Sequence, residues 1–230
     1  IYRIFQLSEV FINMDFQNQF TKTTTDDTLM ETVQHGNSEY PFRYYYENIA
    51  LFDFKCIDWH WHSELEFIYI ENGNVVFDIG TVHFELNEGN GIMINSKILH
   101  RLQSSSDAII PNFLFQPSFI APQDSLIYKK YINPVISSSL EYLVFQPDIP
   151  WQKKVLEIIK TIIAVQETEF NREIIVSMSV QQLWILLLEN LTFDQFENMG
   201  AVISRTRLQL MMQYVHAHYS ENITLEDIAR

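Results

Sequence analysis

Four side chains that can bind metal ions or exchange protons alternate along one short segment: His60, His62, Glu64 and Glu66. If this segment is a β-strand, all four point to one face, because successive side chains of a strand point to opposite sides. Two imidazoles two residues apart can then share one metal ion, and Glu66 can add a carboxylate oxygen. His100 could complete the set from a neighbouring strand. We therefore predict a site for one divalent transition metal at His60, His62, Glu66 and His100.

The same residues have a second interpretation that needs no metal. Histidine and carboxylate side chains inside a barrel can hydrogen-bond a small organic molecule, or one another. On this interpretation Glu64 and one tyrosine of segment 44–46 join the site. The predicted small-molecule-binding residues are His60, His62, Glu64, Glu66, His100 and Tyr44.

The elements that must position these residues are β-strands. Between Pro41 and about Pro122, aromatic and β-branched residues are dense and turn residues recur at short intervals. Asn72-Gly73-Asn74 is typical of a hairpin turn, because Asn and Gly tolerate positive φ. Short strands at this spacing predict an antiparallel sandwich or small barrel. The predicted strands are 44–46, 51–54, 59–70, 75–79, 81–86 and 92–94.

After Pro150 the spacing of apolar residues becomes helical. We predict one helix from Pro150 to about 165, a second over 172–190 and a third over 204–219. A fourth begins after Thr224, which can cap it together with Asp227. The fold class is therefore α+β, with an N-terminal antiparallel barrel followed by a helical region.

Part of the apolar surface of these helices is predicted to face a second copy of the chain. Segment 183–188 is apolar nearly all round, so it must be buried on more than one side. Two helices and a small barrel do not offer enough surface to cover it. The sequence does not decide which helix forms the dimer seam. The candidate dimerisation residues are Val155, Ile158, Ile162, Met178 and Ile185.

Charge and cysteine content narrow the class of protein. The formal net charge of −14 excludes a chain that binds polyanions over its whole surface, because phosphate contacts need clustered Lys and Arg. Residues 1–110 carry 16 acidic and 6 basic side chains, so the acidity lies mostly in the N-terminal half. A single cysteine, Cys56, allows no intrachain disulfide and fits a reducing compartment.

The chain also shows no sign of a membrane span or secretory signal. The densest apolar run, 183–188, is far shorter than the ~20 residues that a membrane helix needs. Glu9 and Asp15 interrupt the apolar residues at the N-terminus, which argues against a signal peptide. We therefore expect a cytoplasmic protein without membrane contact. Residues 18–39 are polar and are expected to form a loose arm; we expect His35 in a solvated loop, with a ligand-gating arm as the alternative.

Two stretches resemble the cupin motifs. His60-x-His62-x-x-x-Glu66, followed by Gly73, resembles the first motif, and Gly89-x-x-x-x-Asn95-x-x-x-x-His100 resembles the second. The second departs from the motif of cupin enzymes by having Asn95 where they usually have proline. Residues 59–66 and 86–100 are also similar to the sensor domains of the AraC/XylS family of bacterial transcription regulators.

A third stretch, 208–229, looks like the entry to the DNA-binding domain of that same family. The residues at the start of this domain are Leu208, Val215, Thr224, Asp227 and Ile228. The three stretches lie in the order of the family's domains. The resemblance implies an arm at 1–39, a cupin effector-binding barrel at 40–125, a helical linker and dimerisation region at 126–200, and the truncated start of a helix-turn-helix domain at 204–230.

The resemblance also implies a function. The barrel would bind a small effector, often a sugar or related metabolite in this family, and the chain would form a homodimer. The recognition helix would lie beyond Arg230, so DNA would be contacted only by residues after it. The alternative is a metal-dependent cupin enzyme, a dioxygenase or isomerase, that uses His60, His62, Glu66 and His100.

Overall fold

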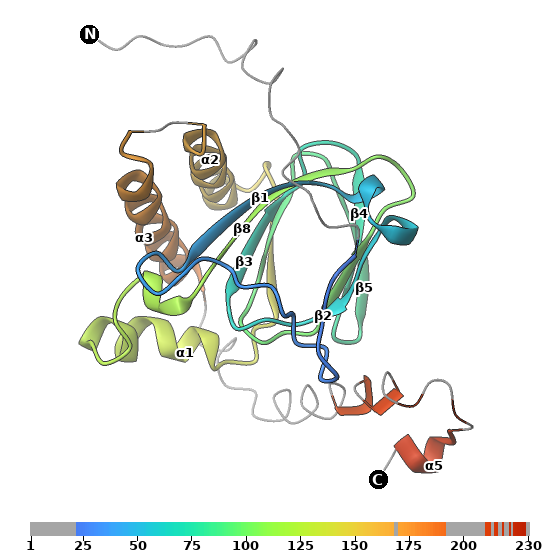
Figure 1. Cartoon of the computed structure of the whole chain (residues 1–230). Helices are drawn as coiled ribbons and strands as arrows, with labels where there is room; N and C mark the ends of the chain where they lie inside the picture. Colours follow the sequence, from blue (N-terminus) through green and yellow to red (C-terminus); the bar gives the residue numbers. More distant parts are fainter. Residues whose placement is uncertain are drawn as a thin grey trace, which may run out of the picture.

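The computed structural model describes residues 22–167, 170–191, 210–212, 214, 215, 218, 221 and 223–228. Two antiparallel sheets face each other as a barrel, and two long helices cover the outer face of the larger sheet (Figure 1). The larger sheet has the strand order β1-β8-β3-β6-β9, and the smaller has β2-β7-β4-β5. The strands are β1 (Phe42–Asn48), β2 (Cys56–His60), β3 (Leu65–Tyr69), β4 (Asn74–Ile79), β5 (Val82–Asn87), β6 (Gly91–Ile94), β7 (His100–Gln103), β8 (Ile109–Phe115) and β9 (Tyr142–Phe145).

The antiparallel barrel predicted from the sequence is confirmed, but two of the predicted strands are wrong. Residues 51–54 are not a strand; the chain there makes two 3₁₀ turns, Ile49–Leu51 and Asp53–Lys55. Phe54 has a φ of 58°, in the left-handed region, which no strand allows.

Segment 59–70 is two strands, not one. β2 ends at His60 in the smaller sheet, and β3 begins at Leu65 in the larger sheet. The chain changes sheets between them, while the alternation of the sequence runs on without a break. The hairpin predicted at Asn72-Gly73-Asn74 is also wrong: Gly73 has the positive φ of a tight turn, 81°, but β3 before it and β4 after it lie in different sheets and do not pair.

The strands of the larger sheet contribute to two separate cores. On β3, Phe67 points outward to the helices and Ile68 points into the space between the two sheets. The Phe67 ring stacks on Phe113 and Phe115 of β8, with centroids 5.3 and 5.9 Å away. The outer core joins the sheet to the helices and the inner core fills one end of the barrel, so β3 stabilises both while also carrying Glu66.

The helices covering the larger sheet are α2 (Pro150–Val165) and α3 (Arg172–Asn190), as predicted. A π-helical turn (Tyr128–Ile132) leads into the short α1 (Asn133–Ile136) at one end of the sheet. Among the helices of the described residues, none is long and apolar enough to span a membrane.

Three of the predicted dimerisation residues lie inside the chain. Val155, Ile158 and Ile162 are buried in the core between α2, α3 and the sheet, so they cannot face a second copy. The sequence correctly predicted that these residues form an apolar face of the helix. This face packs against the larger sheet of the same chain. Met178 and Ile185 on α3 are instead 66% and 56% exposed.

Only part of the predicted third helix belongs to the described residues. Residues 210–212, 214, 215 and 218 are helical, which includes Val215, whereas Leu208 lies outside the described residues. The short α5 (Leu225–Ile228) begins directly after Thr224, as the capping pattern predicts, and includes Asp227 and Ile228.

Residues 22–39 pack along the barrel instead of forming a solvated loop, next to β2 in Figure 1. The backbone N–H of Trp61 donates to Leu29 O at 3.0 Å, and that of Glu31 donates to Trp61 O at 2.9 Å. The indole Nε1 of Trp61 donates to Thr28 O at 2.7 Å. Leu29 is buried. We call residues 22–39 the arm; its described contacts tie it to the loop between β2 and β3.

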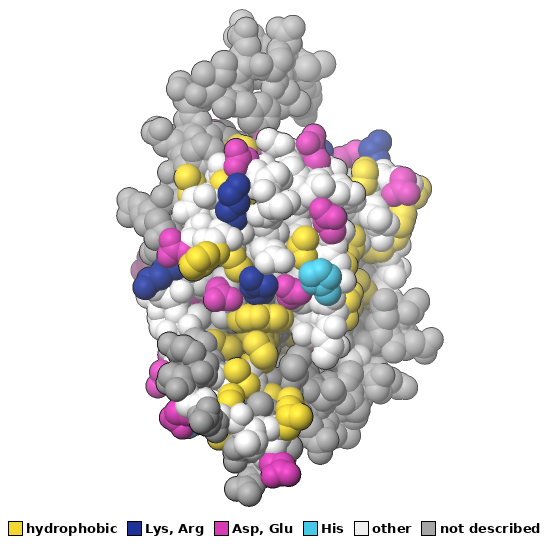
Figure 2. All heavy atoms as spheres, turned by 90° about the vertical axis from the view of Figure 1, so that its right-hand side faces the viewer, with side chains coloured by type: hydrophobic (Ala, Val, Ile, Leu, Met, Phe, Trp, Pro, Cys, Tyr) yellow, Lys and Arg dark blue, Asp and Glu magenta, His cyan; other side chains and the backbone are white. Residues whose placement is uncertain are grey.

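The outer face of the smaller sheet carries a mixture of charges (Figure 2). Arg101 on β7 pairs with Asp78 on β4 at 3.3 Å and with Asp58 on β2 at 3.5 Å. His83 on β5 contacts the same Asp78. In this described part of the surface, cations are matched by carboxylates and do not gather into a patch that would suit phosphates.

Candidate functional site

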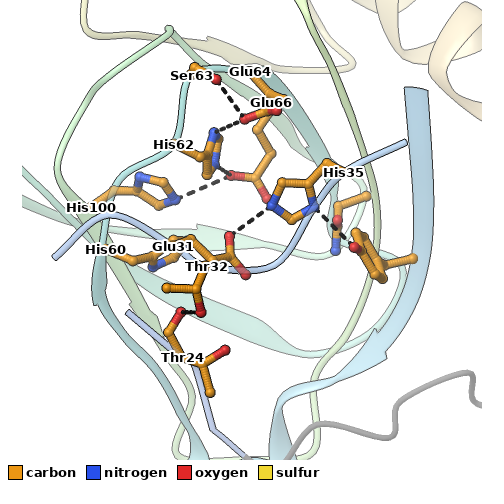
Figure 3. Close-up of polar contacts among 12 residues, drawn as sticks. Thr24, Glu31, Thr32, His35, His60, His62, Ser63, Glu64, Glu66 and His100 are labelled. Carbon is orange, nitrogen blue, oxygen red and sulfur yellow. Dashed lines mark hydrogen bonds and ion pairs between the residues drawn. The ribbon is translucent and has the colours of Figure 1, made fainter. Parts of the chain in front are cut away.

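The residues predicted for the metal site do come together, at one end of the barrel (Figure 3). His60 ends β2, His100 begins β7, and the two are paired across the strands. His62 follows in the loop after β2, and Glu66 enters from β3 of the other sheet. His60, His62 and His100 each offer a ring nitrogen within 4.8 Å of those of the other two. Glu66 Oε2 lies 3.4 Å from His62 Nε2 and 3.2 Å from His100 Nε2.

Hydrogen bonds to the backbone orient two of the imidazoles for metal binding. His60 Nδ1 lies 2.7 Å from Asp58 O, and His100 Nδ1 lies 2.8 Å from Ile98 O. A carbonyl oxygen only accepts, so both Nδ1 atoms donate a hydrogen bond, and Nε2 is the nitrogen that each ring has left to bind a metal. Burial, followed by the neighbouring His100, lowers the pKa of His60 to about 3, which keeps that ring neutral.

Several polar atoms at the centre of this cluster are buried without a hydrogen-bond partner. They are both ring nitrogens of His62, Nε2 of His100 and Oε2 of Glu66. Burial disfavours the charge of Glu66, but its contacts with His100 and His62 outweigh this and hold its pKa well below the usual range. Three imidazoles and one carboxylate form a donor set that suits a divalent transition metal. A cation here would satisfy atoms that the protein itself leaves unpaired.

Glu64 lies beside this cluster and is already engaged. Its Oε1 accepts a hydrogen bond from Gln116 Nε2 at 2.6 Å, and its Oε2 accepts one from Ser63 Oγ at 3.3 Å. Its Oε2 lies 3.8 Å from His62 Nδ1. Both oxygens of Glu64 thus accept hydrogen bonds from neighbouring side chains, and Glu64 is not among the residues that line the cavity described below.

The prediction for Tyr44 is wrong by one position. Tyr44 packs outward against the helix-covered core, and burial raises its pKa far above the usual value. Its neighbour Tyr45 faces inward, because adjacent residues of β1 point to opposite sides. The sequence Tyr44-Tyr45-Tyr46 contains no signal that separates the two faces.

Next to the histidines lies a cavity of about 50 Å³. Of the predicted small-molecule-binding residues, His60 and Glu66 line it. The other lining residues come from the arm and from both sheets: Lys22, Thr23, Thr24, Glu31, Val33, His35, Tyr45, Glu47, Phe52, Ile57, Leu102, Asn112 and Leu114. The lining therefore combines carboxylates with aliphatic and aromatic side chains.

The arm closes this cavity through a buried histidine. His35 Nε2 lies 2.9 Å from Glu31 Oε2, and His35 Nδ1 lies 2.9 Å from Tyr45 Oη (Figure 3). Burial works against a charge on His35, but the hydrogen bond and charge of Glu31 outweigh it and raise its pKa. The pKa of Glu31 is lowered, because the contact with His35 outweighs its own burial. The expectation of a solvated His35 is thus wrong, and its ring also contacts His62 edge-on at 5.7 Å.

Among the polar cavity residues, sequence reasoning did not assign Glu31, Glu47 or Asn112 to the site, and it chose Tyr44 in place of Tyr45. Alternation on β1 puts Tyr45 and Glu47 on one face, but it does not show that this face is the inner one. Nothing in the composition of segment 22–39 indicates that it folds over the barrel, because its contacts with the loop after β2 are mainly backbone hydrogen bonds.

Comparison with known proteins identifies the family. A family described as "AraC-like ligand binding domain" matches residues 52–122, which include the three histidines and Glu66. The chain is 32% identical over 212 residues to an HTH-type transcriptional regulator of Bacillus subtilis (strain 168), YdeC, described as uncharacterized. The match covers 89% of this chain and 71% of that protein. The chain belongs to the AraC family of transcription regulators.

Three solved structures also match the chain, each at low sequence identity. Apo ToxT K231A from Vibrio cholerae is 10% identical, with 85% of this chain and 70% of that chain covered and a TM-score of 0.45. A cupin-2 domain protein from Shewanella frigidimarina is 14% identical over 32% of this chain and 69% of its own, with a TM-score of 0.28. A Bacillus subtilis oxalate decarboxylase with Mn(II) centres is 21% identical over 26% of this chain and 18% of its own, with a TM-score of 0.26.

As an AraC-family protein with a cupin-like barrel, the chain is a ligand-responsive transcription regulator. The matched residues 52–122 run from the 3₁₀ turns before β2 to just past the end of β8, and they include seven of the 15 residues that line the cavity. The arm and β1 precede this match, yet they supply Glu31, His35, Tyr45 and Glu47.

Proposed function

We propose that this regulator binds a small-molecule effector inside the barrel, beneath the arm, and that binding changes how the DNA-binding residues are presented. The observation that carries the proposal is the cavity itself, lined by polar side chains from both sheets and roofed by residues 22–35. An effector can shift a conformational equilibrium only if it binds one arrangement more tightly than another. An arm that supplies cavity residues meets this condition, because the effector would contact Glu31 and His35 only when the arm is closed.

The proposal places DNA recognition in residues after Arg230, in a cytoplasmic protein. Helix-turn-helix modules read the major groove with a recognition helix, and sequence-specific contacts come from its side chains. We expect residues 1–230 to give no sequence-specific shift of promoter DNA in a gel assay, whereas the chain extended through its helix-turn-helix residues gives one that weakens with salt. A tight, salt-sensitive and sequence-specific shift by residues 1–230 would contradict this placement.

We also propose that His60, His62, His100 and Glu66 hold one divalent transition metal. Support comes from the convergence of the three imidazoles, two of them oriented by backbone hydrogen bonds, and from the buried atoms without hydrogen-bond partners. After expression in metal-supplemented medium, elemental analysis should find about one metal per chain, and His100→Gln should lose most of it, because three ligands remain of four.

The matched control for this prediction is His83→Gln, which removes an exposed histidine from the smaller sheet. It should keep the metal content of the unmodified protein. Circular dichroism should show that both variants retain the fold. A content below about a tenth of an equivalent in the unmodified protein would count against the metal site.

Metal-dependent catalysis is the second candidate function, favoured by the three histidines and Glu66 alone. We propose binding in preference to catalysis, because the relative of the chain is a transcription regulator. Turnover of a substrate lost in His100→Gln and retained in His83→Gln would favour the enzyme.

We further propose that the regulator forms a homodimer through the exposed face of α3. Ile174, Met178 and Ile185 form an apolar stripe along this face, at intervals of four and seven residues.

Introducing two lysines, Met178→Lys with Ile185→Lys, should shift the dimer to the monomer in sedimentation analysis, because charges would have to be buried without partners. Thr161→Lys on the exposed face of α2 is the control and should leave the dimer intact. An unchanged dimer in the double variant would place the seam elsewhere.

A further inference from the structure

Three carboxylates from three different elements face the cavity: Glu31 from the arm, Glu47 from β1 and Glu66 from β3. Two of them have imidazole partners, since Glu31 contacts His35 and Glu66 contacts His62 and His100. Glu47 differs, because within the described residues its hydrogen-bond partner is the neutral amide of Asn112, whose Nδ2 donates to Glu47 Oε2 at 2.7 Å.

Glu47 is therefore an acid placed where the fold alone would favour a neutral residue. Burial raises its pKa to about 8, and the nearby Glu66 and Glu31 act in the same direction. A glutamine would accept the same hydrogen bond from Asn112 without the cost of a buried charge. Residues that reduce stability in this way are typical of binding sites.

The surroundings of Glu47 define what could be bound there. Phe52, Ile57, Leu102 and Leu114 supply an apolar wall to the same cavity. Its volume of about 50 Å³ is enough for roughly four water-sized groups beneath the closed arm, at 10–15 Å³ for each. Among the described residues, the cavity thus offers a carboxyl group without a cationic hydrogen-bond partner, several apolar side chains and room for a few heavy atoms.

We propose that Glu47 recognises a positively charged nitrogen of the effector, which makes the effector a small aliphatic ammonium compound. The inference rests on the proposed function, since it names the chemical class of the molecule in the same cavity. The ammonium group donates to the free lone pairs of Glu47, and the alkyl chain covers the apolar wall. Glu31 and Glu66 already contact imidazoles, so Glu47 is the cavity carboxylate that an ammonium group can neutralise, and neither an anionic effector nor a neutral polyol supplies that charge.

A thermal-shift comparison of three molecules with the same carbon chain tests the proposal. The probes are propan-1-amine hydrochloride, propan-1-ol and sodium propionate, at equal ionic strength and pH 7.5, added to residues 1–230. We expect the amine to raise the Tm of the unmodified protein and the alcohol and propionate to leave it unchanged, because binding to the folded state raises stability.

Two variants distinguish binding of the amine to Glu47 from a general attraction of the cation to an acidic protein. Glu47→Gln should weaken amine binding at least about tenfold, since it removes the countercharge. Glu85→Gln, on the exposed surface of β5, removes the same charge from outside the barrel and should bind the amine like the unmodified protein. Calorimetry in two buffers should also detect a proton released from Glu47 as the cation binds, and Glu47→Gln should lose that release.

Each other outcome overturns the proposal. Equal stabilisation of Glu47→Gln and the unmodified protein would mean that the amine binds elsewhere. Stabilisation by propan-1-ol or propionate alone would exclude an ammonium effector while keeping the barrel as a sensor. No stabilisation by the amine at any concentration up to denaturing levels would exclude it as well. Failure of the proposed function is distinguishable from these outcomes. It would appear as specific DNA binding by the extended chain that no effector changes.

Discussion

Replacing Glu47 with glutamine is expected to make the protein more stable, and more so at high pH. The folded state raises the pKa of this carboxyl from 4.5 to about 8, chiefly through burial, so folded Glu47 keeps its proton at pH values where the unfolded chain has lost it. Because the folded state then binds more protons than the unfolded one, the free energy of unfolding falls as pH rises from 4.5 to 8. A shift of this size corresponds to about 5 kcal/mol at most, and the partial exposure of the Glu47 side chain to solvent makes the expected effect smaller.

The measurement is urea unfolding of Glu47→Gln and the unmodified protein at pH 5 and pH 8.5. The difference in the free energy of unfolding should be small at pH 5 and reach a few kcal/mol at pH 8.5. The groups that face Glu47 (Asn112, Glu66, Glu31 and His35) are present in both proteins, so their own titration largely cancels in the difference. Glu85→Gln should show no such growth with pH. A difference that is the same at both pH values would mean that Glu47 ionises freely.

The core between the larger sheet and the helices should be the most sensitive to truncation. Phe67→Ala is expected to lower the free energy of unfolding by about 3–5 kcal/mol. Phe67 is fully buried and stacks on Phe113, Phe115 and Phe145, so a methyl group in its place leaves a cavity that rigid neighbours cannot fill. Urea unfolding followed by circular dichroism measures the loss.

Phe54→Ala provides the matched control, because the same ring is removed from a side chain that is 99% exposed. Its free energy of unfolding should change by less than about 0.5 kcal/mol. Comparable losses in the two variants would contradict the assignment of Phe67 to the core and of Phe54 to the surface.

The cluster of His60, His62, His100 and Glu66 could be predicted from the sequence because residue type and spacing carry most of the information. His60, His62 and Glu66 keep a common direction although the chain changes sheets between them. The prediction placed these residues on one strand, 59–70, whereas the structure has two strands, β2 and β3. The predicted cluster was therefore right although the predicted element was wrong. His100 was found from its position after a turn and strand, and the pairing of β2 with β7 brings it opposite His60.

The cavity lining and the partners of the apolar helix faces were harder to predict from the sequence than the histidine cluster. Which of Tyr44 and Tyr45 faces inward depends on how β1 pairs with β8, a long-range contact that local alternation does not specify. The arm is held by backbone hydrogen bonds to Trp61 and by the buried pair His35–Glu31, neither of which leaves a pattern in the sequence. Val155 and Ile162 show an apolar face, but the sequence cannot say whether that face meets its own sheet or a second chain.

One measurement tests most directly that the barrel cavity is the effector site. A library of small metabolites is screened by thermal shift against the unmodified protein and against Val33→Phe, which replaces the isopropyl group of a cavity-lining arm residue with a benzyl group. Gln34→Phe, at the exposed neighbouring position, is the control. We predict at least one compound that raises the Tm of the unmodified protein and of Gln34→Phe, with this effect lost in Val33→Phe. Stabilising compounds that act equally on all three proteins would contradict effector binding in the barrel.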